Sequence, residues 1–159
     1  MNLEHVVQVA YLQFYLFEKI DVCACENLHS YLPAQAGDQG YSLVDYNRAG
    51  VPLMELVTEP VIHSAEQAGA FARELQRILR YVGASEANME MGQMRVEANI
   101  SVSKDPNVFG TKCEVKNLNS FRSVEEAIKY EVARHIDLIE SGEKVIQETR
   151  GWDEVKMET

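Results

Sequence analysis

A run of strict apolar–polar alternation at residues 93–103, QMRVEANISVS, constrains the fold more than any other feature of the chain. Successive side chains of a β-strand point to opposite faces of a sheet, so the run predicts a strand with one buried face. The apolar face carries Met94, Val96, Ala98, Ile100 and Val102. The polar face carries Arg95, Glu97, Asn99, Ser101 and Ser103.

The segment that follows predicts an antiparallel partner for this strand. KDPNVFG, at residues 104–110, is rich in turn residues, and TKCEVKNL, at residues 111–118, returns to an alternating pattern. Cys113 and Val115 share one face of this second strand, and Lys112, Glu114 and Lys116 lie on the other. The two strands are therefore expected to form a hairpin with a rather long loop.

Two further segments have the spacing of amphipathic helices. Residues 64–82 begin with a capping-box signature at Ser64 and Gln67 and stop at Gly83. The apolar face of this helix carries Phe71, Leu75, Ile78, Leu79 and Val82. The second helix is expected to begin at Ser123, with Glu126 completing the same signature, and to end at Gly142. Its apolar stripe consists of Val124, Ile128, Val132, Ile136 and Ile139.

Upstream of the first helix, the sequence favours extended segments. YSLVDYN (residues 41–47) and PLMELVTE (residues 52–59) flank a turn at residues 48–50, and Pro52 and Pro60 argue against a helix between them. The order from residue 41 is then strands, helix, two strands, helix. This order indicates an α+β fold with both helices packed on one face of the sheet. The opposite face would carry the row Arg95, Glu97 and Asn99.

Residues 1–40 show no clear period and end in the turn-rich segment LPAQAGDQG. The apolar run VVQVAYLQFYLF at residues 6–17 is about half of the ~20 residues that a membrane-spanning helix needs. We interpret this run as a core strand, a core helix or an interface that a partner covers.

Composition narrows the class of protein. A length of 159 residues fits one domain, and a net charge of -10 disfavours binding of nucleic acid or an anionic membrane through the chain's own charge. Three cysteines, Cys23, Cys25 and Cys113, make an odd number without framework spacing, which favours a reducing compartment. Three free thiols are favoured over a zinc site. The four histidines, His5, His29, His63 and His135, show no ligand spacing.

Glu55 is an acid inside the apolar run PLMELV, where burial would be costly without a cation or hydrogen-bond donors. On a strand, Glu55 and Glu59 share a face but lie ~13 Å apart, from four rises of about 3.3 Å. That separation is too large for one metal ion with oxygen ligands. Spacing alone slightly favours a salt bridge from Glu55 to Arg48 or Arg95 over a ligand role.

The row Arg95, Glu97 and Asn99 has two interpretations. Alternating polar residues usually mean only a solvated sheet face, and the pattern alone favours that interpretation. A guanidinium, a carboxylate and an amide together also suit a phosphate with a divalent cation, and Lys116 on the next strand would add a positive charge. KNLNSF, at residues 116–121, has amide groups that fit either a cap or a ligand-binding loop.

Several long blocks, in order, resemble the B subunit of the glutamyl/aspartyl-tRNA amidotransferases of bacteria and organelles. They are SLVDYNRAGVPLMELVTEP, NMEMGQMRVEANISV, GTKCEVKNLNSFRSVEEAIKYEVARHIDLIESG and QETRGWDE, and they run from about residue 42 to residue 154. The resemblance implies domain boundaries at 1–40, an unmatched segment, and 41–159, part of the catalytic (cradle) domain. It also implies the β-α-β-β-α half of a glutamine synthetase/guanido kinase-like sheet.

The resemblance implies a carbon–nitrogen ligase with glutamine as the amido donor. In such a family, ATP and Mg²⁺ phosphorylate the side-chain carboxylate of Glu or Asp mischarged on tRNA(Gln) or tRNA(Asn), and ammonia then displaces the phosphate. The implied partners are the A (amidase) subunit, the small C subunit and the mischarged tRNA, without a membrane. The implied location is the bacterial cytoplasm or the matrix or stroma of an organelle.

The resemblance also assigns site residues. Glu55 and Glu97 are implied as metal ligands, Arg95, Glu97 and Lys116 as catalytic residues, and Arg95, Asn99 and Asn117 as cofactor-binding residues. Glu114 belongs to the same E-x-K-N block. Two features of the family are not recognised before residue 42: a strand with Glu-x-His and an acidic His-x-Glu-Glu-Asp segment. A truncated, non-catalytic scaffold or subunit-docking fragment therefore remains the alternative, and an autonomous tRNA-binding module is disfavoured by the net charge.

Overall fold

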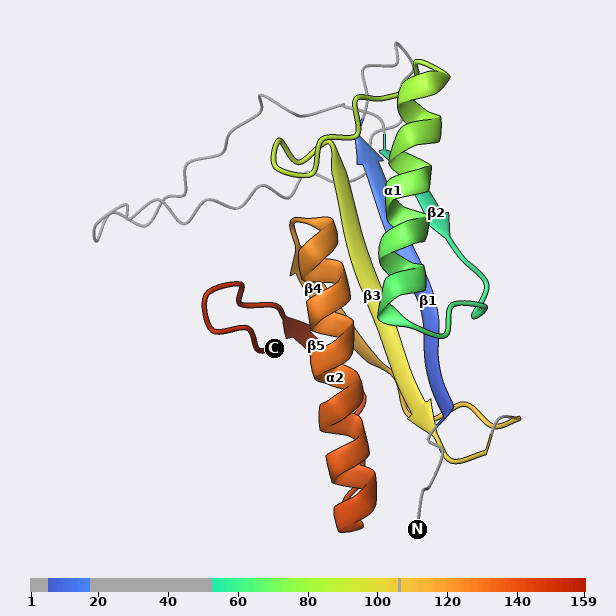
Figure 1. Ribbon diagram of the computed structural model, residues 1–159, viewed down its shortest axis with the longest axis vertical. Helices are drawn as coiled ribbons and strands as arrows, with labels where there is room; N and C mark the ends of the chain where they lie inside the picture. The colour runs from blue at the N-terminus through green and yellow to red at the C-terminus, as the bar shows by residue number, and fades with distance from the viewer. Residues whose placement is uncertain (1–5, 18–52, 106) are drawn as a thin grey trace, which may run out of the picture.

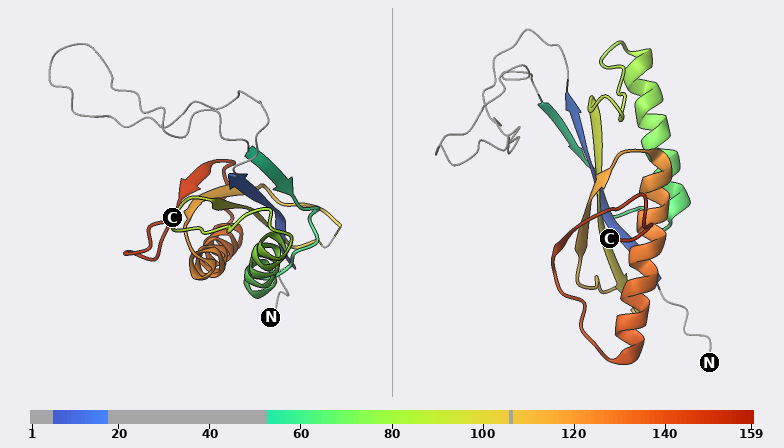
Figure 2. Two further views of the ribbon diagram at one scale, coloured as in Figure 1. Left: turned by 90° about the horizontal axis from the view of Figure 1, so that it is seen from above. Right: turned by 90° about the vertical axis from the view of Figure 1, so that its left-hand side faces the viewer.

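The computed structural model describes residues 6–17, 53–105 and 107–159, the first range by its backbone alone. Within these ranges, five strands form one sheet in the order β2-β1-β3-β4-β5, and two helices cover one face of it (Figures 1 and 2). The elements are β1 (Val6–Phe17), β2 (Leu53–Val57), α1 (Ala65–Tyr81), β3 (Met94–Ser103), β4 (Cys113–Leu118), α2 (Phe121–Ser141) and β5 (Thr149–Gly151). The predicted α+β class and the packing of both helices on one face are confirmed.

The apolar run near the N-terminus is a strand inside the sheet. β1 pairs antiparallel with β2 on one side and with β3 on the other. β2 and β3 therefore run parallel to each other, and α1 provides the crossover that parallel strands require. The predicted extended segment at residues 41–47, the turn at 48–50, Arg48, Cys23 and Cys25 lie outside the described residues.

The predicted hairpin is present as β3 and β4, which pair antiparallel. Met94, Val96, Ala98 and Ile100 of β3 and Val115 of β4 all belong to the hydrophobic core beneath the helices. The parallel strand β5 then pairs with β4 and completes the sheet. The alternation read from residues 94–103 therefore assigns the buried face correctly.

The helix boundaries are only partly as predicted. The hydroxyl of Ser64 accepts a hydrogen bond from the Gln67 N–H and caps α1, as expected. The N-cap of α2 lies three residues earlier than predicted, because Ser120 caps the helix by accepting from the Ser123 N–H. The prediction that Ser123 is the cap was wrong, and Ser123 lies buried in the first turn. Gly142 ends α2 at a φ of 82°, a left-handed conformation that glycine adopts without strain.

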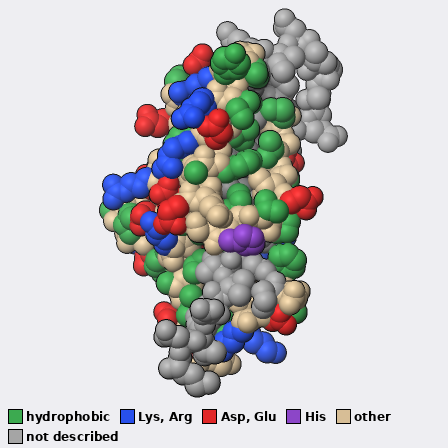
Figure 3. Space-filling view, turned by 45° about the vertical axis from the view of Figure 1, so that its right-hand side comes forward, with side chains coloured by type: hydrophobic (Ala, Val, Ile, Leu, Met, Phe, Trp, Pro, Cys, Tyr) green, Lys and Arg blue, Asp and Glu red, His purple; other side chains and the backbone are tan. Residues whose placement is uncertain are grey.

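The buried face of α1 differs from the predicted one. Leu79 is buried and Leu75 packs against the core, but Phe71, Ile78 and Val82 are exposed. Small residues make the close contacts instead, because Ala68 and Ala72 have no exposed surface. Figure 3 shows hydrophobic side chains gathered on the face turned toward the viewer, next to a row of basic and acidic side chains. The exposed large apolar residues of β2, α1 and its C-cap include Met54, Val57, Phe71, Ile78, Tyr81 and Val82.

Among the described residues β2 is the outermost strand on its side of the sheet, and its exposure overturns the premise that Glu55 lies in a buried run. Of its five residues only Leu56 is partly buried, and Glu55 itself is exposed. Glu59 is also exposed and follows the end of the strand. Most side chains of this apolar run are exposed in the described part of the chain, so Glu55 is not a buried acid that needs a compensating cation. None of the helices that the structure describes is long and apolar enough to cross a membrane.

Candidate active site on the sheet face opposite the helices

A bulge in β4 organises the sheet face that the helices do not cover. Val96 pairs with Leu118 and Ala98 pairs with Val115, so the single residue Glu97 faces the two residues Lys116 and Asn117. Asn117 has a φ of 64°, a left-handed conformation that asparagine tolerates better than most residues. The extra residue returns Leu118 to the buried face and leaves Lys116 beside Glu97. Such bulges re-aim side chains and are frequent next to active sites.

Two carboxylates converge on one ammonium at this bulge. Lys116 Nζ lies 3.4 Å from Glu97 Oε2 and 3.7 Å from Glu114 Oε2. The side chain of Glu97 is only 14% exposed, and its Oε2 atom is buried without a hydrogen-bond donor. Burial raises the pKa of Glu97, the charge of Lys116 opposes that rise, and the charge of Glu114 adds to it. A stronger positive charge at this position would therefore stabilise the ionised form of the Glu97 carboxyl group.

Thr149 is a member of this site that the sequence did not reveal. Its hydroxyl donates a hydrogen bond of 2.8 Å to Glu114 Oε2, and the parallel pairing of β5 with β4 places the two residues in register. The only sequence signal was the position of Thr149 in the block QETRGWDE, which carries no chemistry of its own. Thr149 fixes the orientation of one of the two converging carboxylates.

Glu55 lies on the same face of the sheet as Glu97, although not beside it. Glu55 and Arg95 are both in register with Tyr15, one on each side of β1. Laterally paired residues share a face, so Glu55, Arg95 and Glu97 are on one side of the sheet. Two strand spacings of about 4.8 Å and a two-residue offset of about 6.7 Å put the Cα atoms of Glu55 and Glu97 roughly 12 Å apart.

The remaining predicted site residues differ in exposure. Arg95 and Asn117 are exposed, whereas Asn99 is buried and stands opposite Glu114 across the hairpin. Ser101 is buried as well. The preference for a simple solvated face, which the alternation alone favoured for the row Arg95, Glu97 and Asn99, is therefore wrong for Asn99.

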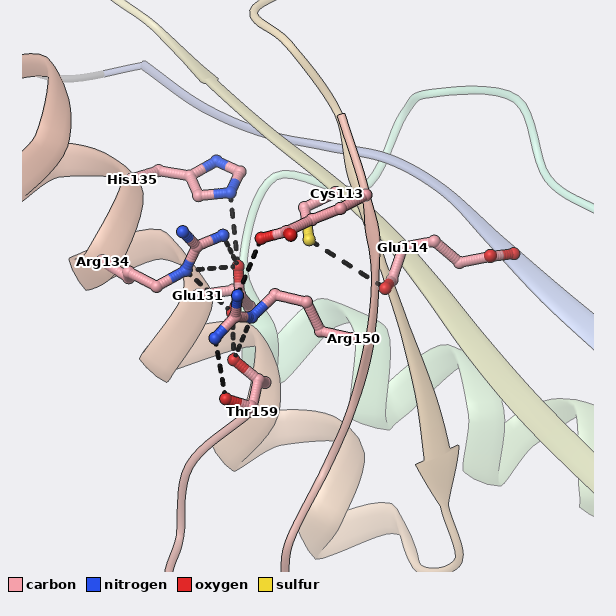
Figure 4. Close-up of polar contacts among 8 residues, drawn as sticks. Cys113, Glu114, Glu131, Arg134, His135, Arg150 and Thr159 are labelled. Atoms are coloured by element: carbon pink, nitrogen blue, oxygen red, sulfur yellow. Dashed lines mark hydrogen bonds and ion pairs between the residues drawn. The ribbon is translucent and has the colours of Figure 1, made fainter. Parts of the chain in front are cut away.

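A second polar cluster lies on the helix side of β4, around Glu131 of α2 (Figure 4). Glu131 is fully buried, and its carboxylate contacts Arg134 (2.7 Å), Arg150 (3.2 Å) and His135 (3.3 Å). The hydroxyl of Thr159 also donates to it. Because Arg150 and Thr159 come from the C-terminal segment, Glu131 ties that segment to α2. Sequence reasoning interpreted His135 as ordinary and did not single out Glu131.

The Glu131 cluster does not favour a metal ion. Cys113, Glu131 and His135 place one ligand atom each within 4.8 Å of one another, and all three are buried. Both oxygens of Glu131, however, already accept from the guanidinium of Arg134, and a second guanidinium, from Arg150, lies beside them. A divalent cation would have to displace or oppose these charges. Burial raises the pKa of the Cys113 thiol to about 11, which keeps it protonated.

The pKa of Glu131 predicts a specific pH dependence of stability. Burial alone raises this pKa, but contacts with His135, Arg134 and Thr159 outweigh burial and hold it at about 2, below the ordinary 4.5. A depressed carboxyl pKa stabilises the fold above about pH 4.5, and this contribution is lost as the pH falls toward 2. In urea unfolding at pH 7 and pH 3, the difference in stability between the wild type and Glu131→Gln is expected to shrink at pH 3. An equal difference at both pH values would contradict this assignment.

Comparison with known proteins identifies the family. A family model described as the GatB/GatE catalytic domain matches residues 21–159. The chain belongs to this family. The match extends upstream of residue 41, the boundary expected from the quoted blocks.

Curated relatives support the same assignment. The B subunit of an aspartyl/glutamyl-tRNA(Asn/Gln) amidotransferase from Trichormus variabilis is 53% identical over 120 residues, which cover 75% of this chain and 24% of that protein. The protein of the same description from Prochlorococcus marinus is 50% identical over 83% of this chain and 27% of its own length. That from Thermodesulfovibrio yellowstonii is 55% identical over 72% of this chain. The chain therefore spans about a quarter of the length of these relatives.

Proposed function

We propose that the chain carries part of the ATP- and Mg²⁺-binding site of a glutamine-dependent tRNA amidotransferase. The reaction would be the one that the names of the relatives describe, conversion of Glu or Asp on tRNA(Gln) or tRNA(Asn) to the amide. The observation that carries this proposal is the convergence of Glu97 and Glu114 on one cation at a bulge, with a buried, unsatisfied Oε2 atom on Glu97. Oxygen ligands of this kind suit Mg²⁺.

The chemistry requires charge neutralisation and positioning more than a protein nucleophile. The side-chain carboxylate oxygen of the substrate bonds to the γ-phosphorus of ATP, the bond to the bridging oxygen breaks, and ADP leaves. Ammonia then attacks the carboxyl carbon and expels inorganic phosphate. Bound Mg²⁺ would neutralise phosphate charge during the transfer. Glu97 and Glu114 would hold it, whereas Glu55, roughly 12 Å from Glu97 on the same sheet face, would serve a separate metal position.

The other residues of this face would contact the nucleotide. Arg95 is exposed and offers a bidentate fork to phosphate oxygens, and Lys116 offers a point charge. Asn117 is exposed at the bulge and has an amide to offer, whereas buried Asn99 would act by supporting its neighbours on β3 and β4. Each of these groups lies on or beside the face that carries Glu97.

The fold supports the same proposal at a finer level. The order β2-α1-β3-β4-α2 has the same sequence of elements as the β-α-β-β-α unit that we propose for one half of a glutamine synthetase/guanido kinase-like catalytic sheet. Residues 41–159 would then form part of a catalytic (cradle) domain. The A (amidase) subunit, the small C subunit and mischarged tRNA would be the partners, in the bacterial cytoplasm or in the matrix or stroma of an organelle.

Reconstitution tests this function. The purified chain, combined with the amidase and small subunits, is expected to hydrolyse ATP in the presence of mischarged tRNA and to form the amide when glutamine is supplied. Glu55→Ala should lose most of this hydrolysis, whereas Glu59→Ala, four residues further on and also exposed, should retain it. Absence of turnover with the wild-type chain would contradict the catalytic proposal.

The exposed apolar residues of α1 and β2 favour a second candidate function, that of a non-catalytic, subunit-docking fragment. Phe71, Ile78 and Val82 are the side chains that would be covered in an assembly. Assembly with the other subunits without ATP turnover would support this function, and Ile78→Lys should then weaken the assembly.

A further inference from the structure

The polar face holds a lysine where the proposed function requires a divalent cation. The ammonium of Lys116 lies between the carboxylates of Glu97 and Glu114, within 4 Å of each. These are the two acids to which the proposed function assigns Mg²⁺, so the inference below rests on that proposal. One position between two carboxylates cannot hold both cations, because like charges at such distances repel.

The ammonium neutralises Glu97 without satisfying its buried oxygen. Lys116 Nζ is at ion-pair distance from Glu97 Oε2, yet that oxygen is buried and has no hydrogen-bond donor. A buried carboxylate oxygen that has an ion pair but no well-formed hydrogen bond is only partly compensated, whereas direct coordination to a metal ion would satisfy it. The ion pair with Lys116 therefore satisfies this oxygen less fully than coordination to a divalent cation would.

Lys129 provides an internal comparison. Its Nζ bridges Glu66 at 3.4 Å and Glu126 at 3.5 Å, which is nearly the same arrangement. Those two acids are 69% and 36% exposed, against 14% and 25% for Glu97 and Glu114. Water screens the Lys129 arrangement, so only the Lys116 arrangement combines a bridging ammonium with a buried, unsatisfied carboxylate oxygen among the lysine bridges that the structure describes.

We propose that Lys116 occupies the cation position of the Glu97–Glu114 pair in the metal-free protein and is displaced by the divalent ion. Its side chain is 43% exposed, and its four-carbon stem lets the ammonium move while the backbone at the bulge stays in place. Once displaced, the ammonium is free to contact the phosphates of the nucleotide. Lys116 thus competes with the metal alone but assists the metal–nucleotide complex.

The test measures Mn²⁺ binding to the chain by electron paramagnetic resonance, first alone and then with ATP. Lys116→Met is expected to bind Mn²⁺ alone about three- to tenfold more tightly, because one competing charge is removed. It is expected to bind Mn²⁺–ATP more weakly than the wild type, because the ammonium no longer contacts phosphate. Lys129→Met, the matched control, should change neither affinity.

Tighter binding of Mn²⁺ alone together with weaker binding of Mn²⁺–ATP distinguishes competition from a structural role, because loss of local structure would weaken both kinds of binding. If Lys116→Met binds Mn²⁺ alone no more tightly than the wild type does, this inference is overturned. Glu97→Gln separates that failure from failure of the proposed function. If Glu97→Gln abolishes Mn²⁺ binding while Lys116→Met does not tighten it, only the inference fails. If Glu97→Gln binds Mn²⁺ as the wild type does, or if no variant binds it, both fail.

Discussion

Replacing Glu131 with glutamine is expected to lower the free energy of unfolding by about 3 kcal/mol. The carboxylate is fully buried and faces Arg134, His135, Arg150 and Thr159. Glutamine keeps the size of the side chain but removes the negative charge that the guanidinium groups of Arg134 and Arg150 neutralise. The arginines are 21% and 26% exposed, so water offsets part of the loss, and the lower end of the range for broken buried pairs applies.

Urea denaturation followed by circular dichroism measures this effect at pH 7. Glu126→Gln is the matched control, because Glu126 lies on the same helix but contacts the exposed Lys129. The control should change stability by less than about 0.5 kcal/mol, as surface substitutions usually do. Equal effects of the two substitutions would show that the Glu131 cluster does not tie the C-terminal segment to α2.

Glu97→Gln is expected to weaken binding of Mg²⁺–ATP at least tenfold, or ~1.4 kcal/mol. An amide has one oxygen and no charge to offer the metal, and the two-carboxylate arrangement with Glu114 is lost. In the presence of a chelator, the same variant should bind ATP no more weakly than the wild type, because removing an acid lowers repulsion of phosphate. Isothermal titration calorimetry with and without Mg²⁺ gives both values.

The control for this prediction is Glu143→Gln, an exposed acid after the end of α2. It should leave both affinities unchanged. A loss of ATP affinity in Glu97→Gln that is the same with and without Mg²⁺ would mean that Glu97 supports the fold of the site rather than the metal.

The parts of the fold that depend on local patterns could be predicted from the sequence. Alternation over residues 94–103 identified β3 and its buried face, and the cap at Ser64 and the stop at Gly142 agree with the structure. These features are decided within a few residues of the chain. The apolar run at residues 6–17 had no such pattern, and its pairing with two strands that are distant in the sequence depends on tertiary structure.

Some residues of the candidate site could be singled out from the sequence, but their arrangement could not. Glu97 and Lys116 were singled out, yet their contact depends on the bulge at Lys116 and Asn117, which plain alternation does not reveal. Thr149 donates to Glu114, 35 residues away in the chain, and Glu131 joins its helix neighbours Arg134 and His135 to Thr159, 28 residues away, so local spacing does not reveal either arrangement. The apolar face of α1 was wrong for a similar reason, because the close contacts use alanines rather than the larger residues.

The central claim is that Glu97 and Glu114 hold the metal that accompanies ATP. The most direct test is a crystal structure of the chain with Mn²⁺ and a non-hydrolysable ATP analogue, with the metal located by its anomalous scattering. We predict a peak within about 2.3 Å of a Glu97 carboxylate oxygen, on the sheet face opposite the helices, with Lys116 moved away from it. A peak beside Cys113 and His135, or no peak near Glu97, would contradict the account.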